Sequence, residues 1–198
     1  MLKDGFHDVP PGKVPVVVTY LEMTSKVPTK DSTLPEGVTF RRVTPDLAWY
    51  REIFTRVGGL EWLWYGRLLL DDDALQTVLT DPGVEVYTLS RDGRDLALME
   101  LDFNEKSACE LQYFALAPEL IGTGAGRYLI NAAIDRAWSK PISRFHLSTC
   151  TIDSPQALGF YRHMGFTPVK QAIQIADDPR LLGILPETAG PRVPLIRP

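Results

Sequence analysis

The chain has 198 residues, of which 44% are hydrophobic and 23% charged, and its formal net charge is -4. These values are typical of one globular domain with a substantial core, and the acidic balance argues against a nucleic-acid partner, which requires a basic face. No run approaches the ~20 apolar residues of a membrane span. Because residues 1–13 lack the apolar stretch of a secretory signal, we expect a cytoplasmic protein.

The two ends of the chain are expected to lie outside a central domain. Residues 14–23, VPVVVTYLEM, are rich in β-branched residues and predict a strand, which is either an added edge strand or a homodimer contact. We expect residues 1–37 to form an N-terminal extension and residues 38–175 a single domain. Residues 176–198 carry prolines and little pattern, so we expect an irregular tail wrapped on the surface.

The first half of the central domain predicts mainly helices after one strand over residues 38–43. Apolar residues at helical spacing predict a helix over residues 46–57, and Gly58 and Gly59 are expected to break it. A second helix is expected over residues 60–70. Asp71 and its two acidic neighbours cap a further short helix.

Strands are predicted around the Asp92-Gly93 pair, over residues 84–90 and 96–103, because Asp-Gly favours a two-residue hairpin. Another strand follows over residues 110–117. Pro118 ends it because proline has no N–H for the ladder.

A glycine-rich turn follows that strand. Gly122, Gly124 and Gly126 alternate with Thr123 and Ala125 directly before an apolar-periodic helix. Glycines let the backbone approach a ligand closely, and a helix N-terminus offers unpaired N–H groups at the positive end of its dipole. The turn therefore predicts a phosphate or pyrophosphate site, with a tight packing turn as the alternative. The Gly-Lys-Ser/Thr triplet of a P-loop does not follow these glycines, which argues against NTP hydrolysis. The dinucleotide-binding pattern G-x-G-x-x-G/A fits neither from Gly122 nor from Gly124, which argues against a dinucleotide site.

A second motif lies near the C-terminus, in residues 154–166, SPQALGFYRHMGF. It follows a strand predicted over residues 143–150 and precedes one predicted over residues 166–175. Ser154 and Pro155 predict the start of a helix. The stretch resembles the A-x-x-x-Y-x-x-x-G-F motif of the GNAT superfamily of N-acetyltransferases, whose four fixed places are filled here by Ala157, Tyr161, Gly165 and Phe166.

The glycine turn in turn resembles that superfamily's acetyl-CoA pyrophosphate loop, Q/R-x-x-G-x-G/A. Gly124 and Gly126 stand in the glycine places, while Ile121 departs from the usual Gln or Arg. The resemblance covers roughly residues 38–175. It implies an α/β (α+β) fold with a mixed, mostly antiparallel central sheet flanked by helices, in which splayed strands form the acetyl-CoA cleft.

The resemblance also implies how the cosubstrate is held. One splayed strand pairs its backbone with the pantetheine arm, and the glycine turn holds the pyrophosphate. The implied binding residues are Phe114, Ala115, Leu116, Gly122, Thr123, Gly124, Ala125, Gly126, Arg127 and Ser154.

The implied reaction moves an acetyl group from acetyl-CoA to a primary amine of a small molecule or peptide, by direct attack in a ternary complex. Tyr161 is the candidate acid, because a phenol of pKa about 10 can protonate the leaving thiolate; core packing is its alternative. Glu110 is the candidate base, at a place where some family members carry a glutamate. A solvated charge at a strand end is one alternative, and Glu100 or Asp102 as base is another. The alternative function is a catalytically silent acyl-CoA-binding sensor.

Other chemistry is less favoured by the sequence. Cys109 and Cys150 fall early and late in two parallel strands, too far apart for a disulfide. His146 lies roughly 13 Å from Cys150 along a strand, so no activated thiolate is expected. The spacing of the three histidines argues against a metal site. Residues 61–65 hold Glu61 and three aromatic residues, which together could bind a cationic amine. The alternative is that Trp64 packs in the hydrophobic core.

Overall fold

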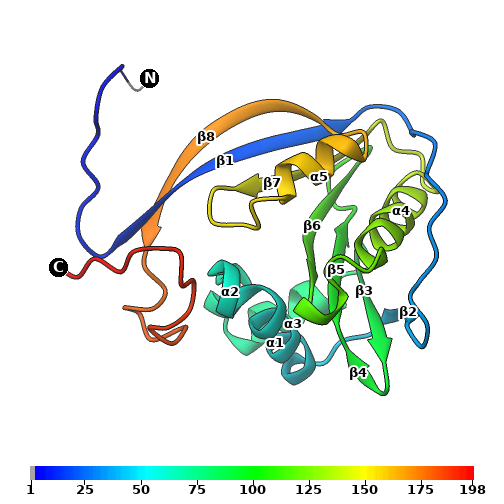
Figure 1. Ribbon diagram of the computed structural model, residues 1–198, viewed down its shortest axis with the longest axis horizontal. Coiled ribbons are helices and arrows are strands. Elements are labelled where there is room, and N and C mark those ends of the chain that lie inside the picture. Colours follow the sequence, from blue (N-terminus) through cyan, green and yellow to red (C-terminus); the bar gives the residue numbers. More distant parts are fainter. Residues whose placement is uncertain (1–2) are drawn as a thin grey trace.

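The computed structural model describes residues 3–198 (Figure 1). Eight strands form one sheet in the order β2-β3-β5-β6-β7-β1-β8, with β4 beside β3. The strands are β1 (Lys13–Met23), β2 (Thr39–Val43), β3 (Val84–Arg91), β4 (Arg94–Asp95), β5 (Ala97–Asp102), β6 (Ala108–Leu116), β7 (Arg144–Cys150) and β8 (Thr167–Asp177). The helices are α1 (Leu47–Phe54), α2 (Leu60–Trp62), α3 (Asp72–Thr80), α4 (Ala125–Ala137) and α5 (Ala157–His163), with shorter helical turns η1 (Thr55–Gly59), η2 (Gly66–Leu69) and η3 (Pro118–Leu120).

The sheet separates two helical layers. Neighbouring residues of a strand point to opposite faces. On β6, the centroid of the Tyr113 ring lies 4.9 Å from that of the Phe54 ring on α1. The next residue, Phe114, stacks on Phe160 of α5 at 5.9 Å. Helices α1 and α5 therefore cover opposite faces. Among the strands of residues 3–198, only the β6–β7 pair is parallel, so the predicted α/β (α+β) fold with a mixed, mostly antiparallel sheet is confirmed.

Strand β1 is present as predicted, but it is not an edge strand. It lies between β7 and β8 and is antiparallel to both. Residues 18–22 of β1 pair with both neighbours, so this half of the strand has no free backbone edge for a second copy, whereas residues 13–17 pair in the sheet only with β8. Leu21 and Met23 on this strand belong to the main core.

The helices after β2 differ from the prediction. The helical path does not stop at Gly58 and Gly59 but continues through them as the π-helical turn η1. A Cβ on Gly58 would lie 2.2 Å from Cε3 of Trp64, so this glycine makes room for the indole ring. The predicted helix over residues 60–70 is only three residues long because Leu63 turns left-handed at φ 57°. Tertiary packing of Trp64 thus overrides the helical pattern.

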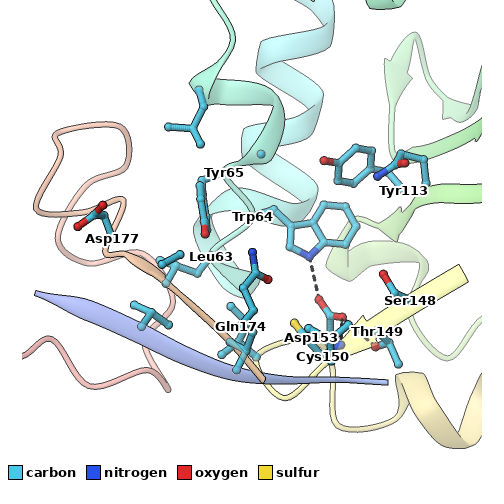
Figure 2. Close-up of a pocket in the computed structure, with 18 of the residues that line it drawn as sticks. Leu63, Trp64, Tyr65, Tyr113, Ser148, Thr149, Cys150, Asp153, Gln174 and Asp177 are labelled. Atoms are coloured by element: carbon cyan, nitrogen blue, oxygen red, sulfur yellow. Dashed lines mark hydrogen bonds between the residues drawn. The ribbon is translucent and has the colours of Figure 1, made fainter. Parts of the chain in front are cut away.

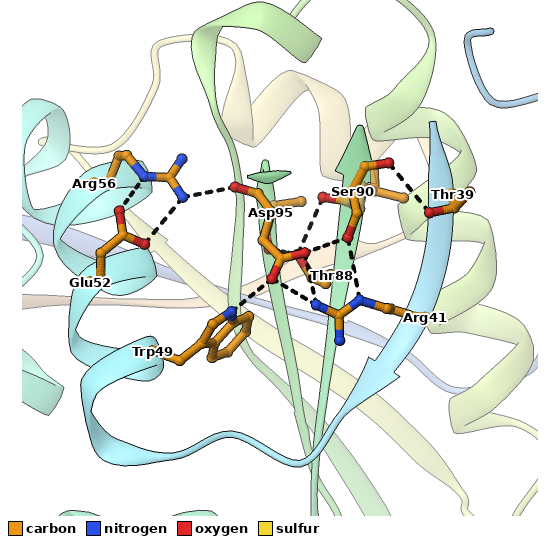
Figure 3. Close-up of polar contacts among 10 residues, drawn as sticks. Thr39, Arg41, Trp49, Glu52, Arg56, Thr88, Ser90 and Asp95 are labelled. Atoms are coloured by element: carbon orange, nitrogen blue, oxygen red, sulfur yellow. Dashed lines mark hydrogen bonds and ion pairs between the residues drawn. The ribbon is translucent and has the colours of Figure 1, made fainter. Parts of the chain in front are cut away.

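Helix α1 is fixed to the β3–β4 hairpin by a polar cluster (Figure 3). Asp95 accepts a hydrogen bond of 2.7 Å from Trp49 Nε1 and a forked pair from Arg41. Arg56 donates to the Asp95 carbonyl oxygen at 2.7 Å. Burial opposes ionisation of Asp95, but hydrogen bonds from Ser90, Trp49 and Arg41 lower its pKa below the ordinary value.

The local turn chemistry follows the sequence closely. Asp92 and Gly93 both have positive φ angles, 52° and 75°, as a type I′ hairpin requires. Asp71 caps α3 by accepting from the Ala74 amide at 2.8 Å. Both signals are local, which is why the sequence alone predicted them.

The C-terminal residues 178–198 are irregular, as expected, but they are more than a surface wrapping. Leu185 and Ala189 are buried in a second core with Val14, Val16 and Leu63. Arg180 is 5% exposed, bonds the Asp178 carboxylate, and donates to three carbonyl oxygens of the tail. These contacts hold the tail together, and the Asp178 amide joins it to the residue before β1 by donating to the Gly12 carbonyl oxygen at 2.9 Å.

Candidate active site

Strands β6 and β7 open into a cleft. Their parallel pairing covers only three positions, from Ala108 opposite Arg144 to Glu110 opposite His146. Beyond Glu110, β6 continues to Leu116 while pairing only with β5, and β7 continues to Cys150 beside β1. The predicted splay of two strands is therefore present, and it leaves one backbone edge of β6 free from Gln112 to Leu116.

The glycine turn lies at the end of this free edge. Gly122 and Gly124 have φ angles of 79° and 91°, and a Cβ on either would meet nothing within 4 Å. Both positions therefore need glycine because of their backbone conformation, and the space beside them is open. Helix α4 begins at Ala125, and its N-cap residue is Gly124, which has no side chain to cap it. The Ala125 amide has a long contact of 3.4 Å to Thr123 Oγ1, and the first N–H groups of any helix have no intrahelical acceptor. An anion can be held there by backbone amides alone.

The side chains of this turn face in different directions. Thr123 closes the turn, because its hydroxyl donates to the Leu120 carbonyl oxygen at 2.7 Å. Ile121 is 62% exposed, so the position where the resemblance expects Gln or Arg points an apolar side chain into solvent. Arg127 is exposed on the first turn of α4.

Helix α5 starts later than predicted. It begins at Ala157, and Ser154 belongs to the preceding turn, in which its carbonyl oxygen accepts from the Ala157 amide at 2.9 Å. The Ser154 hydroxyl donates to Gln156 Oε1 at 2.6 Å and does not cap the helix. The helix ends as predicted at Gly165, whose φ is 97°.

Tyr161 lies on α5 beside the free edge of β6. Tyr161 is 8% exposed. The centroid of its ring lies 6.2 Å from that of Phe114 and 6.1 Å from that of Phe166. Burial, and secondly the charge of Asp153, raise the pKa of Tyr161 above its ordinary value. The phenol is therefore held in its protonated form near neutral pH.

The three candidate carboxylates have different surroundings. Glu100 is fully buried and accepts hydrogen bonds from Tyr50 and Arg67, so it is committed to a structural ion pair. Asp102 accepts from the Asn104 amide at 2.7 Å. Glu110 lies where the splay begins, opposite His146; burial raises its pKa, and the imidazole of His146 lowers it to a lesser extent.

A cavity of about 670 Å³ opens between the splayed strands on the face that carries α1 and α2 (Figure 2). Its lining includes Gln112 and Tyr113 of β6 and Ser148 of β7. Trp64 lines it as well and donates its Nε1–H to Asp153 Oδ1 at 2.9 Å. The indole is thus both packed against the core and exposed to the cavity.

Sequence reasoning missed much of this lining. Residues of β1, β8 and the tail, among them Val16, Gln174 and Leu182, form one wall, and no local pattern shows which strands are neighbours. Asp153 was also missed, although it directly precedes the motif that begins at Ser154. Glu61 is not part of the lining, and Trp62 stacks on Arg192 of the tail at 4.4 Å.

Both cysteines are free thiols. Burial, and secondly Asp153, raise the pKa of Cys150 to about 11, so its thiolate is scarce near neutral pH. Within residues 3–198, no three His, Cys, Asp or Glu side chains are grouped to hold a metal ion. None of the helices in this part of the chain has the length and apolarity needed to cross a membrane.

Comparison with known families decides what kind of protein carries this site. The model of the acetyltransferase (GNAT) family matches residues 47–166, more than half of the 198 residues. The chain belongs to this family.

Solved structures agree on the fold of this GNAT protein. A GCN5-related N-acetyltransferase from Sphaerobacter thermophilus is similar over 88% of this chain and 54% of its own, with TM-score 0.62 and 17% identity. An aminoglycoside acetyltransferase from an uncultured soil metagenomic sample is similar over 70% of this chain and 93% of its own, with TM-score 0.56 and 18% identity. IAA acetyltransferase from Bacillus cereus ATCC 14579 is similar over 67% of this chain and 79% of its own, with TM-score 0.52 and 19% identity.

The chain thus spans about half the length of the first of these structures. No curated protein matches it in sequence. The family match runs from α1 to Phe166. Strand β1, strand β8 and the tail, which build one wall of the cavity, therefore lie outside the matched residues.

Proposed function

We propose that this GNAT acetyltransferase moves an acetyl group from acetyl-CoA to a primary amine, by direct attack in a ternary complex. One observation carries the proposal. The free backbone edge of β6 leads directly into an open glycine turn at a helix N-terminus, and a cavity large enough for a small molecule opens beside it. An acyl carrier with an extended amide-containing arm and a pyrophosphate suits the first two features, and an acceptor suits the third.

The cosubstrate is assigned to backbone groups and a few side chains. In this proposal the pantetheine amides pair with the edge at Phe114, Ala115 and Leu116. The pyrophosphate lies on the amides of residues 122–127, where the positive end of the α4 dipole favours an anion. Ser154 contributes its hydroxyl oxygen at the turn before α5.

Tyr161 is the proposed acid. It lies on α5 against Phe114 of the free edge, and like any phenol it carries its proton at neutral pH, from where it can pass to the leaving thiolate. Burial among Phe114, Phe160 and Phe166 holds the ring in one orientation, which favours a defined proton transfer over free rotation.

Glu110 is the proposed base. Its pKa is raised by burial, which brings a carboxylate closer to the pH at which it can accept a proton from an ammonium group. It does not line the cavity itself. Proton transfer to Glu110 therefore runs through water in this mechanism.

The first test is a thermal melt with and without acetyl-CoA. A ligand present at about 100 times its dissociation constant adds about 2.7 kcal/mol, which raises Tm by roughly 5–10 °C for a chain of this size. No shift at millimolar acetyl-CoA would contradict the pyrophosphate site. A shift without release of CoA thiol across an amine panel would instead favour the catalytically silent sensor.

The second test is Tyr161→Phe. Loss of a general acid costs roughly 10²–10⁴-fold in rate, so we expect turnover to fall by at least 100-fold. The acetyl-CoA-induced shift in Tm should stay the same, because the ring remains packed. An unchanged turnover would remove Tyr161 from the mechanism.

A further inference from the structure

The cavity beside β6 is mainly apolar. Its aliphatic lining comes from separate parts of the chain and includes Val14, Val16, Leu63, Leu69, Ile152 and Leu182. Trp64, Tyr65 and Tyr113 add aromatic surface. Such a lining suits a molecule with an apolar body, because burying apolar surface contributes about 25 cal/mol per Å².

Asp153 brings a negative charge to this apolar surface. Its Oδ1 accepts from Trp64 Nε1 at 2.9 Å, and its Oδ2 accepts from the Thr149 hydroxyl and the Cys150 amide, both at 2.8 Å (Figure 2). All three donors are neutral. Among residues 3–198, no lysine, arginine or histidine forms an ion pair with this carboxylate.

The other charges near the cavity are compensated. Asp177, also in the lining, pairs with Lys13 at 2.6 Å, and Arg67 pairs with the buried Glu100. No lysine, arginine or histidine of the described chain lines the cavity. Asp153 therefore leaves the cavity with one carboxylate that lacks a cationic partner.

The charge of Asp153 also reaches the cleft. After burial, it is the largest cause that raises the pKa values of the Cys150 thiol, at the end of β7, and of the Tyr161 phenol on α5. Because Asp153 also accepts from the Cys150 amide at the end of β7, a group held by Asp153 would lie at the open end of the splay.

From this arrangement we infer that the acceptor carries a single ammonium group on an apolar body. Asp153 binds the ammonium group, and the valines of β1 with Trp64 and Leu63 contact the body. This inference rests on the proposed acetyl transfer for its biological role. It names Asp153 and the β1 wall as the residues that select the acceptor.

Binding of three matched probes tests the inference without acetyl-CoA. The probes are 2-phenylethylammonium, 2-phenylethanol and 3-phenylpropanoate, which share an apolar body and differ in charge, and calorimetry measures each dissociation constant. Because hydrogen bonds to charged groups are stronger than neutral ones, we expect the ammonium probe to bind at least ~10-fold more tightly than the alcohol. The carboxylate should bind most weakly.

Two variants with the same chemical change locate the charge. Asp153→Asn should abolish the preference for the ammonium probe, whereas Asp177→Asn should leave it within about twofold, because Asp177 is already paired with Lys13. Thermal melts establish that each variant is folded. If Asp153→Asn does not fold, the unaltered protein and Asp177→Asn still test the inference.

Three results would overturn the inference: equal binding of alcohol and ammonium to the unaltered protein, a preference retained by folded Asp153→Asn, or a preference lost in Asp177→Asn. The proposed function fails separately. A protein that prefers the ammonium probe but transfers no acetyl group to any amine would contradict the transferase and leave the Asp153 site standing.

Discussion

At the scale of single residues, the site combines groups whose protonation is set by burial. Tyr161 and Glu110 both have raised pKa values, with burial as the first cause. Burial keeps the Tyr161 phenol protonated but makes it a weaker acid, whereas it makes the Glu110 carboxylate, the proposed base, a better proton acceptor. The same burial costs folding stability at Glu110, because a carboxylate that must ionise in a partly dry site opposes folding at neutral pH.

Replacing Glu110 by Gln tests that link. The raised folded-state pKa means that ionisation destabilises the folded protein as pH rises above the ordinary value, so Glu110→Gln should raise Tm at pH 7. If Glu110 is the base, kcat/KM should fall by at least ~100-fold, and the acid limb of the pH–rate profile should disappear.

Asp102→Asn is the matched control, because Asp102 faces Glu110 across the β5–β6 ladder and bonds a turn amide. It should keep kcat/KM within a few-fold. Equal losses in both variants would argue against a specific role for Glu110.

At the scale of elements, β1 is a structural part of the sheet. It joins β8 to β7 through two antiparallel ladders, and its valines form a wall of the cavity together with the C-terminal tail. Without β1, strand β8 would have no partner in the sheet. The N-terminal strand therefore supports both the sheet and the wall of the cavity.

Deleting residues 1–23 should abolish cooperative folding, because it removes the buried Leu21 and Met23, leaves β8 unpaired and leaves β7 with only its short pairing to β6. Deleting residues 1–8, which lie before β1, should change Tm by only a few degrees. Circular dichroism melts measure both. A cooperative transition in the longer deletion would contradict this role of β1. Light scattering of the unaltered protein would separately test the homodimer that was one alternative for this strand.

At the scale of the whole molecule, the dependence of stability on pH should reflect a buried carboxylate far from the site. Glu85 on β3 is 2% exposed and accepts from Arg136 and Tyr87, with Lys140 at 3.1 Å. Burial opposes its ionisation, but these hydrogen bonds lower its pKa to about 2. The folded state thus binds fewer protons than the unfolded chain between the two pKa values.

The contribution of Glu85 to the free energy of unfolding should therefore be fully present above its ordinary pKa of 4.5 and be lost as the pH falls toward about 2. Glu85→Gln should lower the free energy of unfolding at pH 7 by about 1–3 kcal/mol, because Arg136 and Lys140 lose their partner. The substitution should also make the free energy of unfolding fall less steeply between about pH 4.5 and 3. Urea melts across that range measure both effects.

Glu119→Gln removes the partner of Arg94 in an exposed pair and should change little. Parallel pH curves for Glu85→Gln and the unaltered protein would show that another group governs acid unfolding.

The sequence by itself determined those parts of this protein that depend on near neighbours in the chain. The Asp92-Gly93 hairpin, the Asp71 cap and the left-handed Gly165 are local backbone requirements, so residue type alone indicated them. The resemblance of the glycine turn and of residues 154–166 to two GNAT motifs also implied the fold and the splayed strands. These signals involve contacts within a few residues.

Only the tertiary structure decided which distant segments meet. Strand β1 lies inside the sheet, Trp64 packs over Gly58 and reaches Asp153, and the tail closes the cavity wall. Each depends on pairing or packing between residues far apart in sequence, and an alternating strand pattern is the same whichever neighbour the strand has. The glycine turn was therefore predictable from local sequence, whereas the cavity was not, because its walls come from five separated parts of the chain, within residues 14–18, 63–69, 112–113, 148–153 and 174–182.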